Sequence, residues 1–179
     1  MTKMVVSVGQ FIHRKGFDVL LKAWAKCPAE NDLYIIGAEP TEEYLTLKRE
    51  LALENVYFVG FKSKEELKEY YRAADLFVLP TREDIWGLVV NEAMANGLPV
   101  ITTDRCVAGL ELVKNGVNGY IVPVDDIEAL AQKMCAVLGD DELRSTMAEN
   151  SLNAIRDWTV EKMADEHCTL MKKFLTENK

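Results

Sequence analysis

Two acidic side chains are the residues whose types and spacing point most directly to chemistry. In the stretch Thr81 to Val100, TREDIWGLVVNEAMANGLPV, Asp84 precedes a predicted helix and Glu92 lies within it, eight residues later. A carboxylate among apolar residues is costly unless it is hydrogen-bonded or reaches solvent. Eight helical residues span ~12 Å, whereas glycosidase carboxyls lie ~5–9.5 Å apart. The spacing therefore favours two acids that hold hydroxyl groups at opposite ends of one ligand.

The same region offers a site for an anion. The predicted helix begins near Trp86 or Gly87, and the free N–H groups at a helix N-terminus bind phosphate readily. A second loop, GQFIHRKG, contains Gln10, Arg14 and Lys15 directly before another helix. It lacks the glycine spacing of a dinucleotide loop or a P-loop. Its cations suit a phosphate or diphosphate, although a solvated basic turn stays an alternative.

The rest of the chain must position these loops. Short apolar runs alternate with helical periodicity. The predicted strands are 4–8, 33–36, 56–59, 75–80, 99–103 and 119–122, and the predicted helices are 17–27, 42–53, 64 to about 73, 87 to about 95, 127–138, 141–155 and 160–175. Ser63 and Glu66 predict a capping box. The link between the last two strands is predicted to be irregular.

Strands separated by helices indicate an α/β protein with a parallel sheet. Six strands in this rhythm predict a Rossmann-like doubly wound sheet, flanked by helices, with the order 3-2-1-4-5-6. Ligands bind such sheets where the strand order reverses, which here is between the first and fourth strands. The loops at that point are 9–16 and 81–87, so topology alone brings the two candidate loops together.

Composition narrows the function classes. The chain has 179 residues, 49% hydrophobic and 28% charged, which fits a single domain with an adequate core. A net charge of −8 argues against nucleic acid as a partner. Four dispersed cysteines and two histidines predict no metal site and no disulfide framework. The N-terminus does not fit a signal peptide and no apolar run is long enough to span a membrane, which predicts a cytoplasmic protein.

Several blocks, in order, carry a family resemblance. DIWGLVVNEAMANGLPVI resembles the acidic E-x7-E region of the family 4 (group 1) retaining GT-B glycosyltransferases, and VGQFIHRKGFDVLLKA, VYFVGFKSKEELKEYYRAADLFVLPT and NGVNGYIVPVDD agree with it. The resemblance covers essentially the whole chain. It implies the C-terminal half of a GT-B fold, which binds a UDP-, GDP- or ADP-sugar without a metal cofactor. The full enzyme would transfer the sugar in polysaccharide, glycolipid or cell-surface glycan synthesis.

The resemblance also implies roles for the acids, which are the catalytic candidates. Glu92 matches the family's second acid, which holds the ribose hydroxyls. Asp84 occupies the first acidic position, usually glutamate, which contacts the donor sugar, and Glu83 is the alternative first acid.

The remaining candidates would bind the nucleotide sugar. Lys15 matches the family's phosphate-binding lysine, and Gln10 replaces an arginine whose charge Arg14 could supply. Phe61 and Lys62 correspond to the wall around the base. Sugar and phosphate contacts fall to Ile85, Trp86, Gly87 and Leu88, of which Trp86 replaces a phenylalanine and is predicted to pack or to act as a lid.

Family members pair this domain with an N-terminal domain that binds the acceptor, a glycan or lipid. The final helix, at about 159–176, resembles the segment that crosses back to that domain. Alone it would expose an apolar face and favour self-association, and the full-length enzyme could lie at the membrane periphery. Two alternatives stay open: a nucleotide-sugar-binding module that needs a partner chain, and a GT-B phosphorylase or epimerase. The chain alone is expected to be weakly active or inactive.

Overall fold

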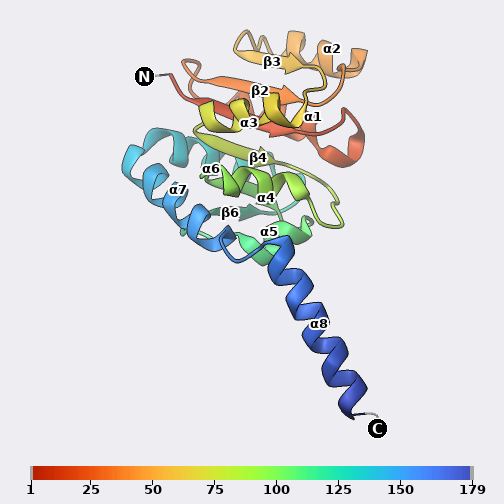
Figure 1. The fold of residues 1–179 in the computed structure, drawn as a ribbon. Helices are drawn as coiled ribbons and strands as arrows, with labels where there is room; N and C mark the ends of the chain where they lie inside the picture. The colour runs from red at the N-terminus through yellow and green to blue at the C-terminus, as the bar shows by residue number, and fades with distance from the viewer. Residues whose placement is uncertain (1, 178–179) are drawn as a thin grey trace.

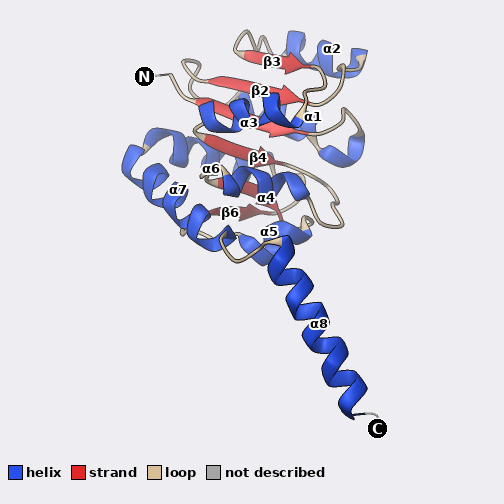
Figure 2. Cartoon of the chain, viewed as in Figure 1, coloured by secondary structure: helices blue, strands red, loops and turns tan. Residues whose placement is uncertain are grey.

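The computed structural model describes residues 2–177 and contains a six-stranded parallel sheet with the order β3-β2-β1-β4-β5-β6 (Figure 2). This confirms the predicted topology. Most β-branched residues of the strands are buried because helices cover both faces of the sheet. The strands are β1 Met4–Val8, β2 Asp32–Ile36, β3 Val56–Val59, β4 Leu76–Leu79, β5 Val100–Thr103 and β6 Gly119–Val122.

Helices form a layer on each face of the sheet (Figure 1). Helices α1, α2 and α6 share one hydrophobic core, whereas α3, α4 and α5 share the other. Helix α7 contacts both α6 and α4. The helices are the 3-10 turn η1 His13–Lys15, α1 Phe17–Trp24, α2 Glu42–Glu50, α3 Lys64–Ala73, α4 Leu88–Ala95, α5 Val107–Leu112, α6 Ile127–Gly139, α7 Asp141–Ile155 and α8 Val160–Glu177.

Two helices end earlier than predicted. Helix α1 stops at Trp24 instead of residue 27, because the amides of Lys26 and Cys27 bond carbonyl oxygens three residues back, in a 3-10 pattern, before Pro28. Helix α2 stops at Glu50 instead of residue 53, because Ala52 adopts a left-handed conformation with φ 51° that closes the helix. Both differences lie far from the candidate loops. The capping box at Ser63 is confirmed.

The link between β5 and β6 was predicted to be irregular, and this was wrong. It contains helix α5. Gly109, which weakened the helical pattern, lies against β5, since a β-carbon there would be 2.3 Å from Thr102 Cγ2. The glycine is thus a point of close packing within a short helix.

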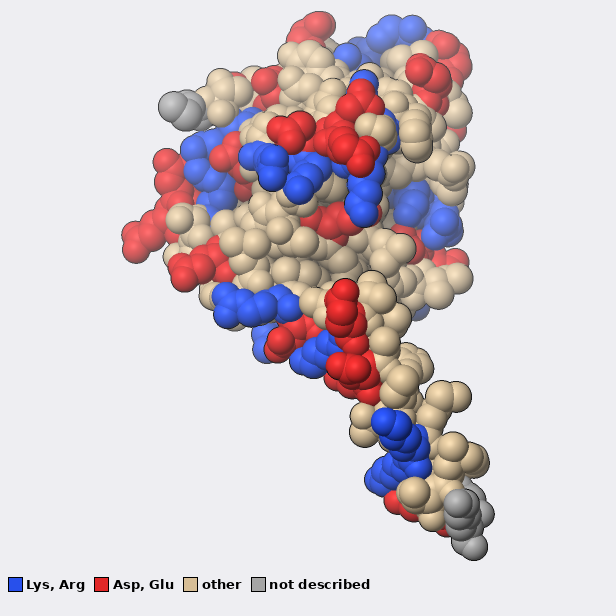
Figure 3. Space-filling view, viewed as in Figure 1, with Lys and Arg blue, Asp and Glu red and all other residues tan. Residues whose placement is uncertain are grey.

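Helix α8 extends away from the body of the molecule (Figure 1). All its described side chains are exposed, among them the large apolar Met163, Leu170 and Met171. Figure 3 shows both signs of charge on this helix and across the visible face of the body. Within residues 2–177, no helix is long and apolar enough to cross a membrane.

Candidate functional site

The two candidate loops meet at the carboxyl ends of β1 and β4, as predicted. The carbonyl oxygen of Arg14 accepts hydrogen bonds from the Arg82 amide at 2.8 Å and from Thr81 Oγ1 at 2.9 Å. In return, Arg14 Nη1 donates to the Glu83 carbonyl oxygen at 2.9 Å. These bonds join residues far apart in the chain, so each loop fixes the position of the other.

Gly16 allows this close approach. Its φ of 68° is left-handed, which favours glycine. A β-carbon at this position would lie 2.0 Å from the carbonyl oxygen of Pro80. Any larger residue would push the first loop away from the end of β4.

The predicted cation and the predicted first acid form an ion pair. Lys15 Nζ lies 2.6 Å from Asp84 Oδ2, and the two side chains are only 14% and 13% exposed. Partial burial strengthens such a pair relative to one in open water. Lys15 and Asp84 therefore belong to one polar centre between the loops, and Asp84, rather than the exposed Glu83, is the acid in contact with the cation.

Arg82 links the two site loops to α1 and to the loop after β6, a role that was not predicted from the sequence. Its guanidinium binds Asp18 through two bonds of 2.8 Å, pairs with Asp125 at 2.7 Å, and donates to the His13 carbonyl oxygen at 2.7 Å. Burial alone would raise the pKa of Asp18, but the bonds from Arg82 outweigh it and lower that pKa. The same bonds raise the pKa of Arg82. The charged cluster joins α1, the loop after β6 and both site loops.

The segment before α4 is held by the segment before α5. The Asp84 amide donates to the Arg105 carbonyl oxygen at 3.0 Å, and the Ala108 amide donates to that of Trp86 at 2.8 Å. Gly87 then turns into α4 with φ 93°, where a β-carbon would lie 2.8 Å from Cys106 Sγ. The helix that sequence analysis missed therefore helps to shape the site.

Helix α4 begins beside the ion pair. Gly87 is its N-cap, and no side chain caps the first amides of the helix. Such N–H groups and the helix dipole favour an anion. A lysine and a helix N-terminus are therefore available to one negatively charged group.

Glu92 is exposed, yet its carboxylate has a partner. Tyr71 OH donates to Glu92 Oε2 at 3.0 Å. The tyrosine itself is buried, with 2% exposure. The two conditions under which a carboxylate is tolerated on this apolar helix are therefore both met, since it reaches solvent and is also hydrogen-bonded.

The other predicted site residues are largely exposed to solvent. Gln10, Phe61, Ile85 and Leu88 are exposed, the last three at 82%, 84% and 68%. Lys62 Nζ lies 3.5 Å from Glu66 Oε1, within its own segment. No polar contact among the described residues ties these five side chains to Lys15 or Asp84.

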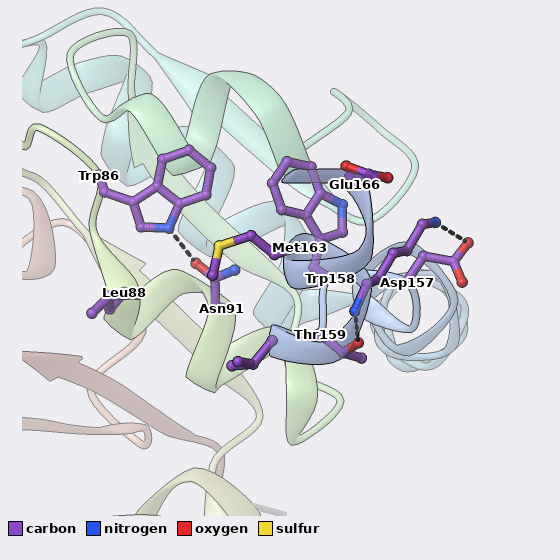
Figure 4. A pocket seen from close by; sticks show the side chains of 10 residues that line it. Trp86, Leu88, Asn91, Asp157, Trp158, Thr159, Met163 and Glu166 are labelled. Carbon is purple, nitrogen blue, oxygen red and sulfur yellow. Dashed lines mark hydrogen bonds and ion pairs between the residues drawn. The ribbon is translucent and has the colours of Figure 1, made fainter. Parts of the chain in front are cut away.

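Trp86 packs, as one of its predicted roles required. Its Nε1 donates to Asn91 Oδ1 at 2.9 Å, and its ring lies 5.7 Å from that of Trp158. Figure 4 shows both indoles among the side chains that line one cavity. The volume of this cavity is about 570 Å³. Leu88, Val160 and Met163 also line this cavity, so it joins the start of α4 to the start of α8.

Other groups offer little additional chemistry. Within residues 2–177, no cluster of three or more histidine, cysteine, aspartate or glutamate side chains is placed to hold a metal ion. The four cysteines are free thiols, with Cys27 Sγ 3.5 Å from Cys135 Sγ.

The doubly wound parallel sheet defines a Rossmann-like α/β domain, with a lysine, a carboxylate and a helix N-terminus at its switch point. The family described as glycosyl transferases group 1 matches residues 1–154. The chain belongs to this family, and its partial length fits the C-terminal domain of such proteins.

Individual proteins agree with this assignment. The lipopolysaccharide core biosynthesis glycosyltransferase LpsE of Rhizobium meliloti is 30% identical, over 82% of this chain and 42% of its own. The sucrose-phosphate synthase of Thermosynechococcus elongatus is 29% identical, with a TM-score of 0.87 over 98% of this chain and 46% of its own.

Anabaena HepE, solved in complex with UDP and glucose, has the same fold, with 24% identity and a TM-score of 0.87 over 96% of this chain and 48% of its own. The chain spans less than half of the length of the curated relatives it matches, with shares of 47%, 39% and 42% in three of them.

Proposed function

We propose that this chain is the donor-binding domain of a retaining glycosyltransferase, which holds a nucleotide-diphosphate sugar for transfer to an acceptor. The observation that carries the proposal is the Lys15–Asp84 ion pair beside the N-terminus of α4. These groups supply a cation and free amides for a diphosphate, next to a carboxylate that can accept hydrogen bonds from a sugar.

Each end of the donor has a proposed holder. Glu92 accepts hydrogen bonds from the ribose hydroxyls, and Asp84 contacts the donor sugar, with Glu83 as the alternative. Lys15 and the first amides of α4 stabilise the diphosphate as negative charge develops on it during departure. Gln10 and Arg14 extend the phosphate contacts, whereas Phe61 and Lys62 border the base.

The acceptor would bind to a second domain. The exposed apolar side chains of α8 and the cavity at its base support contact of this helix with that domain. The relative LpsE is named for lipopolysaccharide core synthesis, which makes a glycan or glycolipid acceptor the first class to test. Metal independence, weak or absent activity of the chain alone, and a cytoplasmic location stay predictions.

A second candidate function is a binding subunit whose acceptor half is a separate polypeptide. The same uncovered face of α8 favours it. Purification of the tagged chain from its native host, followed by mass spectrometry, distinguishes the two. A second Rossmann-like polypeptide in equal amount supports the subunit, and a single longer chain that contains both halves contradicts it.

The donor role is tested by calorimetric titration of the folded chain with UDP, GDP, ADP and their glucose conjugates. We expect binding of one nucleotide series, weakened at least tenfold by Glu92→Ala. Glu149→Ala, on an exposed position of α7, is the control and should leave binding unchanged. Absence of binding by all six compounds would contradict the proposal.

A further inference from the structure

The Glu92 carboxylate accepts a hydrogen bond from a side chain of another helix. Tyr71 lies in the last turn of α3, and its hydroxyl donates to Glu92 Oε2 at 3.0 Å. This is the only side chain among residues 2–177 that hydrogen-bonds the Glu92 carboxylate. Oε1 is left available for a ligand.

The tyrosine has little freedom to move. It is 2% exposed and lies in the core shared by α3, α4 and the sheet. Its ring meets that of Phe77, on β4, edge-on with centroids 6.0 Å apart. A buried ring in a close-packed core keeps its rotamer, so the hydroxyl has a fixed position beneath α4.

The direction of the hydrogen bond is also fixed. Burial, together with the nearby Glu92 charge, raises the pKa of Tyr71 well above its ordinary value. The phenol therefore keeps its proton and acts as the donor, and the carboxylate acts as the acceptor. Hydrogen bonds to a charged acceptor are shorter and stronger than neutral ones.

We infer that Tyr71 is a positioning residue for ribose recognition, which holds the exposed Glu92 carboxylate in one orientation before the nucleotide arrives. The inference rests on the proposed ribose role of Glu92. A free glutamate on a helix surface samples several rotamers, and ordering it on binding reduces affinity. Because Tyr71 already orders the Glu92 side chain in the free protein, less affinity is lost when the nucleotide binds.

The neighbouring Tyr70 provides a matched comparison. It lies on the same helix, but its ring is next to that of Tyr34, with centroids 6.1 Å apart. No hydrogen bond among the described residues joins its hydroxyl to the Glu92 carboxylate. Removing either hydroxyl leaves an aromatic ring of nearly the same size. Only the loss from Tyr71 should affect how the site discriminates a ribose from a sugar without its two hydroxyls.

The experiment compares UDP with 2′,3′-dideoxy-UDP in calorimetric titrations of the folded chain, with the GDP and ADP pairs run in the same way. We expect the wild type to prefer the ribonucleotide. Tyr71→Phe should weaken ribonucleotide binding about three- to tenfold and leave the dideoxy compound unchanged. Tyr70→Phe should leave both unchanged, and thermal unfolding of each variant shows that it is folded.

The outcomes separate this inference from the function on which it rests. If Glu92→Gln removes the ribose preference and Tyr71→Phe keeps it, Tyr71 does not position the acid and the donor site stands. Equal weakening of both compounds by Tyr71→Phe shows a general structural role and also overturns the inference. If the wild type has no ribose preference, or no nucleotide binds, the ribose role of Glu92 is wrong, and the inference with it.

Discussion

Lys15 and Asp84 neutralise each other across the two site loops, with 2.6 Å between Nζ and Oδ2. One is the proposed ligand of the diphosphate, and the other is the proposed contact of the donor sugar. A phosphate that enters the site must therefore compete with the Asp84 carboxylate for Lys15. The two members of this pair should therefore respond oppositely to mutation.

Asp84→Asn should raise the affinity for UDP severalfold, because it removes the carboxylate that competes for Lys15. Lys15→Gln should lower it at least tenfold, because a charge-assisted bond to phosphate is lost. Titrations at 50 mM and 200 mM salt measure both changes, and the wild type should bind more weakly at the higher salt. Lys22→Gln, on an exposed part of α1, is the control. A drop in UDP affinity on Asp84→Asn would contradict the competition.

Arg82→Gln should destabilise the chain by about 2–4 kcal/mol, because partly buried Asp18 loses the partner that compensates its charge. It should also weaken UDP binding, because the loops lose a shared anchor. Arg82→Lys should recover only part of both, since lysine cannot make the two parallel bonds to Asp18. Urea unfolding and UDP titration measure the two effects.

Arg49→Gln is the comparison for Arg82, because its ion pair with Glu42 lies on the surface. Little change in stability is expected there. Equal losses for the two arginine variants would show that the charged cluster behind the site contributes nothing special.

Gly16→Ala should destabilise the chain by more than the conformational cost of about 1–2 kcal/mol for a left-handed residue. Its β-carbon would collide with Pro80, at 2.0 Å from the carbonyl oxygen. Gly116→Ala isolates the conformational part, because Gly116 has φ 76° and a β-carbon there would meet no atom within 4 Å. Thermal unfolding of both variants tests this. Equal losses of stability in the two alanine variants would show that the backbone at Pro80 can move to accommodate the β-carbon.

Stability should fall in acid partly through Asp18. The pKa of Asp18 is lower in the folded chain than its ordinary value of 3.8. Its contribution is therefore complete above about 3.8 and is lost as the pH falls through the folded-state pKa. Asp18→Asn should be less stable than the wild type at pH 7, and this difference should shrink as the pH falls below 3.8. Urea unfolding at a series of pH values from 7 downward checks this. Asp165→Asn, on exposed α8, should track the wild type throughout.

The chain alone should self-associate through α8, because its exposed apolar side chains would otherwise face water. Sedimentation velocity at increasing concentration measures this. Replacing Met163, Leu170 and Met171 by serine should abolish the concentration dependence. Val117→Ser removes an exposed apolar side chain from another part of the surface and should not. A wild-type chain that stays monomeric at high concentration would contradict the prediction.

The strand order and the meeting of the two candidate loops could be predicted, because both follow from the alternation of strands and helices along the chain. A β-branched run such as Met4–Val8 indicates a covered strand, and the six-strand alternation then determines which loops meet. The type of a residue also indicated that Lys15 and Asp84 belong to the site. Their direct contact could not be predicted, because 69 residues separate them and the loop geometry decides it.

The anchors of the site could not be predicted for the same reason. Tyr71 and Glu92 lie 21 residues apart on different helices, and Arg82 and Asp18 lie 64 apart. Their contacts depend on how the helices lie across the sheet, which periodicity does not describe. No role was predicted for Tyr71. Its hydroxyl, in a core that would otherwise favour phenylalanine, was the available signal.

The bonds that join the two loops end largely on main-chain carbonyl oxygens, those of His13, Arg14 and Glu83. An exchange of the His13 or Glu83 side chain therefore leaves these acceptors in place, whereas an exchange of Arg14 would remove the donor to the Glu83 carbonyl oxygen. Proteins with this framework can acquire different surface chemistry around an unchanged crevice. Retention of this fold at 29% identity, with a TM-score of 0.87 over 98% of the chain, is compatible with such exchange.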